Sequence, residues 1–320
     1  MKSLLLIFVF FVSFYVVKAQ QESRFTHSMF TYNYVNPGSV GSSDLGDASI
    51  LVKEQNLGFK TTDGKSLSPQ SVIANFSMPV TRFNSGIGLC VYNSSDGFEK
   101  DLEPKLSYAY QAKIGDGKLG IGASISYLQV GFDYDLLRAE DENDVYLQGI
   151  KATDKYKLIS CGFGAHYKVD RAYFGLSATR INQPKLKGNS QDFNYTSRHY
   201  YLYGGYVYPT NITGFTLKPS VFIRSTGASA SLASLNFIGE YNNLFFGGFV
   251  YSTNNDISAL LGIEFKDGSK LDGMRASASY DLFTNKLKQY SKGTLEFSVG
   301  YAFSMNVEKS IKTYKSVRFL

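Results

Sequence analysis

The chain has 320 residues, of which 43% are hydrophobic and 19% charged, with a net charge of +6 and a mean hydropathy of −0.15. It contains 24 Tyr, 25 Phe and 30 Gly but no Trp. The abundant aromatics exclude a disordered chain, and the mild charge gives no case for nucleic-acid binding. This composition favours a β-rich fold.

Residues 1–19 predict a secretory signal peptide. Lys2 precedes an apolar stretch over residues 4–17, and residues 17–19 suit a cleavage site. The stretch is short for a membrane-spanning helix, which needs about 20 apolar residues. We expect Gln20 to be the first mature residue, which leaves 31 basic against 27 acidic residues. No Cys stands at the cleavage site, so a lipid-anchored form is excluded.

Apolar residues alternate with small or polar ones along the rest of the chain. In residues 118–131 one face carries Leu119, Ile121, Ala123, Ile125 and Tyr127, whereas Gly and Ser dominate the other. A period of two residues indicates β-strands. The pattern predicts 14 strands, centred on residues 48–54, 70–79, 85–92, 104–113, 118–131, 158–168, 172–180, 198–208, 215–225, 230–240, 244–252, 257–266, 273–282 and 293–303.

The predicted links alternate in length. Links near residues 82–84, 114–117, 169–171 and 241–243 are turn-like, whereas residues 55–69, 93–103, 132–157, 181–197 and 283–292 form longer links. Short turns at one end and long loops at the other are typical of an outer-membrane barrel, whose short turns face the periplasm. We therefore predict an all-β fold, a transmembrane antiparallel up-and-down β-barrel over residues 48–303, with both termini periplasmic.

A soluble β-sandwich would also explain the alternation, but its polar face should be rich in charge. Here that face is mostly Gly, Ser, Ala and Thr, which suits a narrow lumen. The expected lumen-facing residues with chemical functionality are Lys105, Lys118, His166, Lys168, Arg275, Asp281 and Glu296. Tyr200, Tyr201, Tyr203, Tyr206 and Tyr208 are expected in an aromatic girdle at the membrane interface.

Two segments flank the predicted barrel. Residues 20–47 are rich in Phe, Tyr and Asn and are expected to lie in the periplasm or to fold back and plug the lumen. Residues 304–320 form a basic periplasmic tail, which is either a disordered overhang or a partner-docking segment. Its candidate docking residues are Lys309, Lys312, Tyr314, Lys315, Arg318, Phe319 and Leu320.

The sequence offers little catalytic chemistry. Cys90 and Cys161 lie in apolar runs and are expected to be buried or lipid-facing rather than paired. A lipid-cleaving enzyme would need a Ser-His pair facing the outer leaflet, whereas His166 points to the lumen and His199 suits the surface or the girdle. The acidic run Glu140, Asp141, Glu142 and Asp144 lacks the order of an EF-hand loop and suits a solvated loop. We expect no catalytic residue, cofactor or metal.

Motifs across the whole mature chain resemble the PorP/SprF family of type IX secretion membrane proteins. The first is residues 25–41, FTHSMFTYNYVNPGSVG, where the family has an Asn-Pro-Ala-like step before a Gly. The others lie at residues 93–97, 117–122, 163–167, 173–178, 217–220, 242–248, 279–282, 293–301 and 318–320. The chain departs from the family pattern in Gly38 and in lacking Trp.

The resemblance implies a non-enzymatic outer-membrane component of type IX secretion and gliding motility that assists export or surface attachment of large adhesin-like cargo. It implies as partners other secretion components, including periplasmic peptidoglycan-associated proteins, and outer-membrane lipid. Two alternatives stay open: a pore or small-solute transporter, and a structural barrel that contacts peptidoglycan-linked proteins without a part in export.

Overall fold

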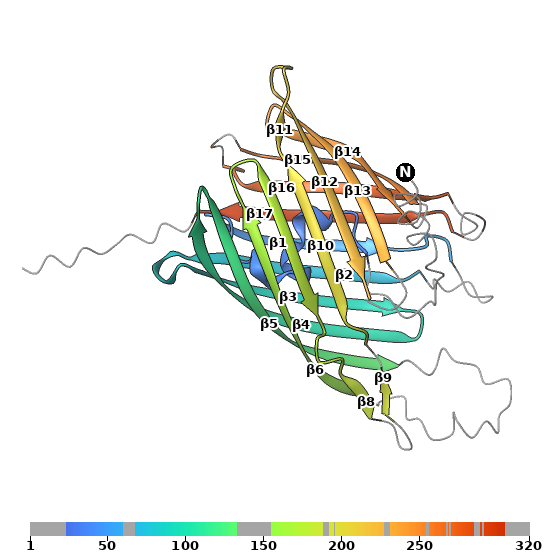
Figure 1. The fold of residues 1–320 in the computed structure, drawn as a ribbon. Helices are drawn as coiled ribbons and strands as arrows, with labels where there is room; N and C mark the ends of the chain where they lie inside the picture. Colours follow the sequence, from blue (N-terminus) through green and yellow to red (C-terminus); the bar gives the residue numbers. More distant parts are fainter. Residues whose placement is uncertain are drawn as a thin grey trace, which may run out of the picture.

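A computed structural model describes residues 24–59, 68–132, 155–187, 192–194, 196–226, 231–253, 256–266, 268, 270–284, 289 and 291–304. In this part of the chain 14 antiparallel strands close into one barrel (Figure 1). The prediction of a 14-stranded antiparallel barrel is therefore confirmed. The barrel strands are β1 (Gly46–Glu54), β2 (Gln70–Val80), β3 (Ser85–Asp96), β4 (Glu99–Ile114), β5 (Gly117–Phe132), β6 (Lys155–Lys168), β7 (Ala172–Thr179), β10 (His199–Tyr206), β12 (Phe215–Ser225), β13 (Ser231–Tyr241), β14 (Phe245–Ser252), β15 (Asp256–Glu264), β16 (Met274–Phe283) and β17 (Thr294–Phe303).

Each barrel strand pairs with its neighbours in sequence, and β1 pairs with β17 to close the ring, with Gly46 opposite Phe303. The pairing of β10 with β12 spans the short link that contains β11 (Tyr208–Pro209). A separate hairpin, β8 (Lys185–Lys187) with β9 (Asp192–Asn194), lies in the link between β7 and β10. Closure satisfies the backbone of every strand, as a hydrocarbon environment requires.

The two faces of the wall differ as the alternation predicts. On β17, Phe297 and Val299 are about half exposed on the outside, at 52% and 55%, whereas Glu296 and Ser298 are buried on the inside. The same division holds on β5, where Ile121 and Ile125 face out. The outward residues form an apolar surface that suits lipid, and the small inward residues leave room inside the ring.

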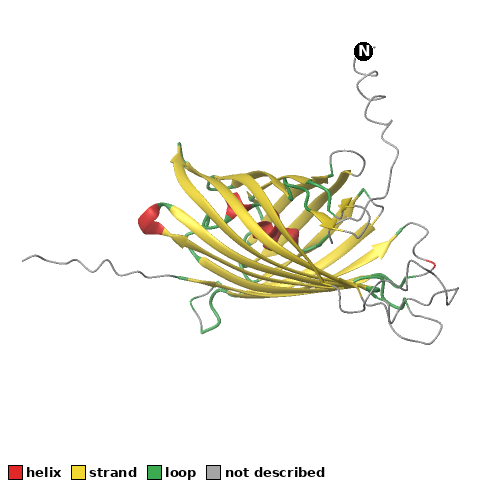
Figure 2. Cartoon of the chain, turned by 90° about the horizontal axis from the view of Figure 1, so that it is seen from below, coloured by secondary structure: helices red, strands yellow, loops and turns green. Residues whose placement is uncertain are grey.

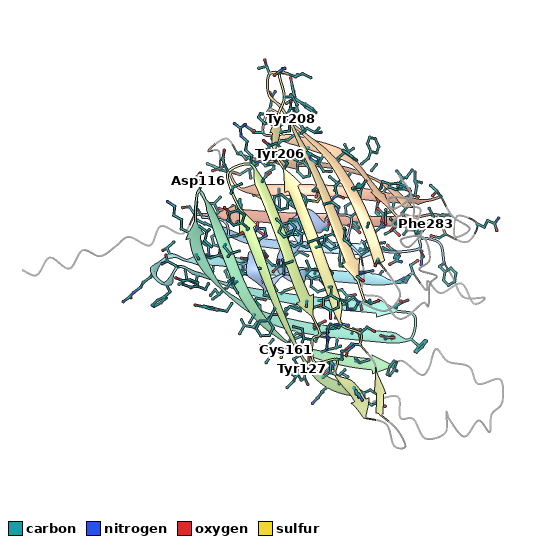
Figure 3. All side chains as sticks on the ribbon, viewed as in Figure 1. Asp116, Tyr127, Cys161, Tyr206, Tyr208 and Phe283 are labelled. Atoms are coloured by element: carbon teal, nitrogen blue, oxygen red, sulfur yellow. The ribbon has the colours of Figure 1, made fainter. Side chains whose placement is uncertain are left out.

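The two ends of the barrel differ in their links. Residues 81–84, 115–116, 169–171 and 242–244 make tight connections at one end, the short-turn end, where Gly46 and Phe303 also lie. The opposite end, the long-loop end, carries the links at residues 55–69, 133–154, 180–198 and 284–293. Asp116 and Phe283 mark these two ends in Figure 3.

One predicted long link is wrong. Residues 93–103 belong mostly to β3 and β4, which meet in a turn of two residues, Gly97 and Phe98. Gly97 adopts the left-handed conformation that such a turn needs (φ 58°). Charged residues such as Asp96, Glu99 and Asp101 interrupt the apolar alternation here, and the ladder pairing of the two strands continues through them.

The aromatic girdle prediction fails for two tyrosines of β10. Tyr200 is 43% exposed and faces outward, but Tyr201 and Tyr203 are almost fully buried inside the barrel. His199 shares their inward face, is 1% exposed and stacks on Tyr201, so the predicted surface or girdle position is wrong. The period of two residues places alternate members of a tyrosine run on opposite faces.

Both cysteines are free, Cys90 inside the barrel and Cys161 on the outer wall. None of the helices among the described residues combines the length and the apolar character that crossing a membrane requires.

The lipid-facing wall predicts the effect of one substitution. Leu261 is 73% exposed near the middle of β15, so Leu261→Arg should lower the free energy of unfolding in lipid bilayers by about 2–4 kcal/mol. Gln129→Arg, near the long-loop end of β5, is the control and should change it by at most about 1 kcal/mol. Urea titration in liposomes measures both, and equal effects would contradict the assignment of a lipid-facing band.

Candidate functional site

The site is the interior of the barrel, which contains the N-terminal segment, residues 24–45. Its three short helices, η1 (Ser28–Phe30), α2 (Tyr32–Val35) and η2 (Pro37–Ser39), lie within the ring of strands in both views (Figures 1 and 2). Hydrogen bonds join the segment to β17, β4 and β7 around the ring. The segment therefore occupies the lumen.

The segment runs through the barrel from end to end. Arg24 forms ion pairs at the long-loop end, with Asp256 at 3.1 Å and Asp281 at 3.5 Å. The segment then reaches β1 at Gly46, at the short-turn end. An even number of strands places Gly46 and Phe303 at one end, but the start of the described chain lies at the other. That both termini lie in the periplasm stays a prediction, because the two ends of the chain lie outside the described residues.

A buried charge cluster fixes the start of the segment. The carboxylate of Glu296, which is fully buried, accepts hydrogen bonds from the backbone N–H groups of Thr26 (2.9 Å) and His27 (3.1 Å) and lies 2.9 Å from Nδ1 of His27. Lys53 lies 3.8 Å from the same carboxylate and donates to the carbonyl of Arg24. A buried carboxylate is tolerated only with such partners.

A second contact fixes the middle of the segment at Asn36, Pro37 and Gly38. The Asn36 amide nitrogen is 2.9 Å from the Ala165 carbonyl, and its amide oxygen accepts from the N–H of Gly38 at 2.8 Å. The segment lies directly against three inward-facing glycines of β5 and β6. A Cβ atom added to any of them would lie within 2.8 Å of the segment, either of its backbone or of the Asn36 side chain. These are Gly120, Gly122 and Gly164, and we call them the glycine cradle. Only glycine permits so close an approach.

An aromatic layer crosses the lumen at this level. Tyr32 stacks on Tyr203 with ring centroids 4.1 Å apart, and Phe25 and Tyr34 pack against Tyr92 of β3. The buried cluster also contains Leu51, Ile73, Tyr201 and Phe222, so it draws on β1, β2, β3, β10 and β12. We call this cluster the septum.

Polar cavities lie on the two sides of the septum. The cavity at the long-loop end has a volume of about 320 Å³ and is lined by charged residues that include Arg24, Lys53, Arg224 and Asp256. The cavity at the short-turn end has a volume of about 310 Å³ and is lined by residues that include Asn33, Asp47, His166 and Arg275. The septum residues between them are fully or nearly buried.

The predicted lumen residues all lie on the inward face of their strands. Lys105 donates to the Tyr34 carbonyl at 2.9 Å, and His166 lies 3.0 Å from the Tyr203 hydroxyl. Arg275 pairs with Asp47 at 2.6 Å, and Asp281 accepts from the Thr26 hydroxyl at 2.8 Å. Glu296 anchors the segment as described above. Lys105, Asp281 and Glu296 therefore contact the segment, and His166 contacts the septum. Arg275 binds Asp47 at the start of β1.

Lys118 and Lys168 lie farther out, opposite each other in the ladder near the short-turn end. Lys118 binds Asp44, and this hydrogen bond lowers the pKa of the Asp44 carboxyl. Lys168 is exposed. The predicted tail residues of 304–320, apart from Ser304, and the acidic run at Glu140, Asp141, Glu142 and Asp144 lie outside the described residues.

Several site residues were missed in the sequence. Arg24, Thr26 and Asn36 precede the strands, and nothing local in the sequence indicates their distant partners. The one available signal was the run of inward-facing glycines at 120, 122 and 164, because glycine in a strand often marks a close approach of another backbone. Within the described ranges, no group of three or more His, Cys, Asp or Glu residues is placed to hold a metal ion.

The family model "Type IX secretion system membrane protein PorP/SprF" matches residues 17–301. The chain belongs to the PorP/SprF family. The family and the barrel architecture together indicate an outer-membrane protein of the type IX secretion system. A protein of this family works with other components of that system. The matched range contains the N-terminal segment and all 14 barrel strands except the last residues of β17.

Solved barrels have a similar architecture at low identity. The CymD monoaromatic hydrocarbon channel is 11% identical, with a TM-score of 0.48 over 85% of this chain and 92% of its own. A TodX monoaromatic hydrocarbon channel mutant is 10% identical, with a TM-score of 0.48 over 84% and 93%. A mutant of the Rh. blastica porin is 9% identical, with a TM-score of 0.34 over 81% and 99%. No curated protein sequence matches the PorP/SprF chain.

The glycine cradle predicts how the segment can be displaced. In Gly122→Val the new side chain would meet the Pro37 backbone at 2.5 Å, so the segment should leave its seat and the amides of residues 25–41 should exchange hydrogen about tenfold faster or more. Gly131→Val on the same strand is the control, because its nearest neighbour is 3.7 Å away. Hydrogen–deuterium exchange in detergent micelles measures both, and unchanged exchange in Gly122→Val would refute the cradle.

Proposed function

We propose that this PorP/SprF protein is a non-enzymatic outer-membrane accessory of type IX secretion and gliding motility that assists export or surface attachment of adhesin-like cargo. The observation that carries the proposal is the family match over residues 17–301. The filled lumen supports a role in docking rather than conduction. In this proposal the barrel is an anchor, and its partners act at its ends.

The main alternative is a pore or small-solute transporter. The septum argues against it, because fully buried side chains such as Tyr203 and Ile73 separate the two polar cavities. Opening a path would also separate the Glu296 carboxylate from Thr26 and His27 and leave it with Lys53 at 3.8 Å, and a buried carboxylate is destabilised when it loses hydrogen-bond donors. The intact segment therefore favours a closed barrel.

The positions of the histidines argue against hydrolysis of membrane lipid. All three lie in the described part of the chain, and His27, His166 and His199 are buried inside the barrel. Hydrolysis of membrane lipid needs a general base on the lipid-facing side. The inward position of each ring places it out of reach of a lipid ester.

The proposed partners are other type IX components, including periplasmic peptidoglycan-associated proteins, together with large adhesin-like cargo and outer-membrane lipid. The short-turn end, where the chain continues beyond Ser304, is the proposed periplasmic face. In this scheme the basic tail docks on a periplasmic partner through its lysines and terminal apolar residues.

A closed barrel predicts low conductance. The full-length protein in planar bilayers should show no large, stable conductance, whereas a variant without residues 25–40 should conduct because the septum loses Phe25, Tyr32 and Tyr34. Deletion of residues 306–320 is the control and should leave the barrel closed. Large, stable currents through the intact protein would favour the pore alternative.

The secretion role predicts the outcome of gene deletion. Surface proteomics of the deletion strain should show loss of at least one large adhesin, with uptake of small solutes unchanged. Reintroducing the protein without residues 306–320 tests the tail, and unchanged adhesin display would refute the docking role of the tail alone. Normal adhesin display in the full deletion would refute the secretion role itself.

A further inference from the structure

The cavity at the short-turn end has the size of a small ligand pocket. Its volume of about 310 Å³ lies at the lower end of the range for such pockets, about 300–1,000 Å³. One side of it is formed by the N-terminal segment between Met29 and Asp47, and the other by wall residues that include His166 and Arg275. The septum lies between this cavity and the one at the long-loop end, so it is a pocket rather than a passage.

The mouth of this cavity opens at the short-turn end of the barrel. Ser43 and Leu45 line it and are exposed, and they lie just before the start of β1 at that end. In the proposed orientation this end faces the periplasm. A ligand therefore reaches the cavity from the periplasm and not from the lipid.

The charged groups that line the cavity already neutralise one another. The Arg275 guanidinium donates to both carboxylate oxygens of Asp47, at 2.6 and 3.0 Å. Glu264 forms an ion pair with Lys266 at 2.9 Å. A charged ligand would lose its hydration without meeting an unpaired opposite charge among these groups, so the lining favours a neutral ligand.

Other polar groups of the lining keep hydrogen-bonding capacity. Nδ1 of His166 lies 3.0 Å from the Tyr203 hydroxyl, and its other ring nitrogen has no partner among the described residues although His166 is only 4% exposed. The amide oxygen of Asn33 accepts from the Ser39 hydroxyl at 3.0 Å, which leaves its NH₂ group to donate. The Ser42 hydroxyl forms no hydrogen bond within the described part of the chain. A ligand rich in hydroxyl groups can replace water at all three.

Two aromatic rings lie beside these polar groups. Phe30 and Tyr32 of the segment line the same cavity and are half-buried. Tyr203 covers one face of Tyr32, and the Arg275 guanidinium lies 5.1 Å from the centroid of Phe30, so part of each ring is left for a ligand. A sugar ring suits both kinds of surface, because its hydroxyl groups lie at the rim and its C–H groups form an apolar face that packs on aromatic rings.

We propose that this cavity binds a small neutral saccharide. Asn33, Ser42 and His166 form hydrogen bonds with its hydroxyl groups, and Phe30 and Tyr32 pack against its C–H face. The saccharide is either a unit of the cell-wall glycan or a free sugar of the periplasm. This site goes beyond the secretion role, since its ligand is neither the cargo nor a protein component of the system.

Calorimetry on the purified full-length protein tests this site. The protein is kept in an amine-oxide detergent, because maltoside and glucoside detergents carry sugars themselves. Chitobiose carries the N-acetyl groups of cell-wall glycan and cellobiose lacks them, so a preference for one of them identifies the source. Saturable binding of either disaccharide is the expected result. Failure of both to bind at millimolar concentration would overturn the proposal, as would equally tight binding of a blocked, uncharged tripeptide of Ser and Ala.

Matched substitutions show which cavity binds the saccharide. Ser42→Trp fills the short-turn cavity and should weaken binding tenfold or more, whereas Ser95→Trp places the same side chain in the long-loop cavity and should leave binding unchanged. Asn33→Ala removes a hydrogen-bond donor and should weaken binding about three- to tenfold, so the test survives if Ser42→Trp does not fold. Undiminished binding in either folded variant of the short-turn cavity, or loss of binding in Ser95→Trp, would overturn the proposal. The assay contains no cargo or other secretion component, so its outcome is independent of the secretion role.

Discussion

The close approach of the N-terminal backbone to the glycine cradle is the contact on which the rest of the interior depends. Because Gly120, Gly122 and Gly164 carry no Cβ, residues 36–38 lie directly against the wall. This contact fixes the position of the segment along the barrel axis. At that position Tyr32 stacks on Tyr203, and Thr26 and His27 reach Glu296. A wall with side chains at these positions would have to be wider, and the septum would lose its contacts.

The segment has no stable structure of its own to contribute. Its helices contain three or four residues each, far below the length at which an isolated helix persists in water. Its conformation is therefore held by the wall, through Asn36 in the middle and the charge cluster at the long-loop end. The wall in turn gains partners for its buried polar groups, such as Lys105 and Ser177. Barrel and segment therefore stabilise each other.

Alternation predicts the strands well because lipid imposes one rule on every outward position. It failed where that rule does not act. Residues 93–103 carry charged side chains that break the alternation although the strands continue, and Tyr201 and Tyr203 lie inside, where aromatics pack as readily as at an interface. The path of residues 24–45 was predicted only as one of two options, because partners more than 100 residues apart leave no local pattern. Glycine spacing was the one sign of the site, and it does not say which segment approaches.

The filled lumen limits which functions the barrel supports. Two charged anchors hold the segment near its ends, Glu296 with Thr26 and His27 at one and Lys118 with Asp44 at the other, and the septum lies between them. Removing the segment would leave Glu296 and Lys53 buried with fewer partners and would expose the aromatic cluster to water, and both changes are costly. A solute gradient forms no contacts with the protein that would offset this loss of stability. The interior therefore acts as a support between the two ends of the barrel, and in the proposed function partners bind at the ends and on the outer wall.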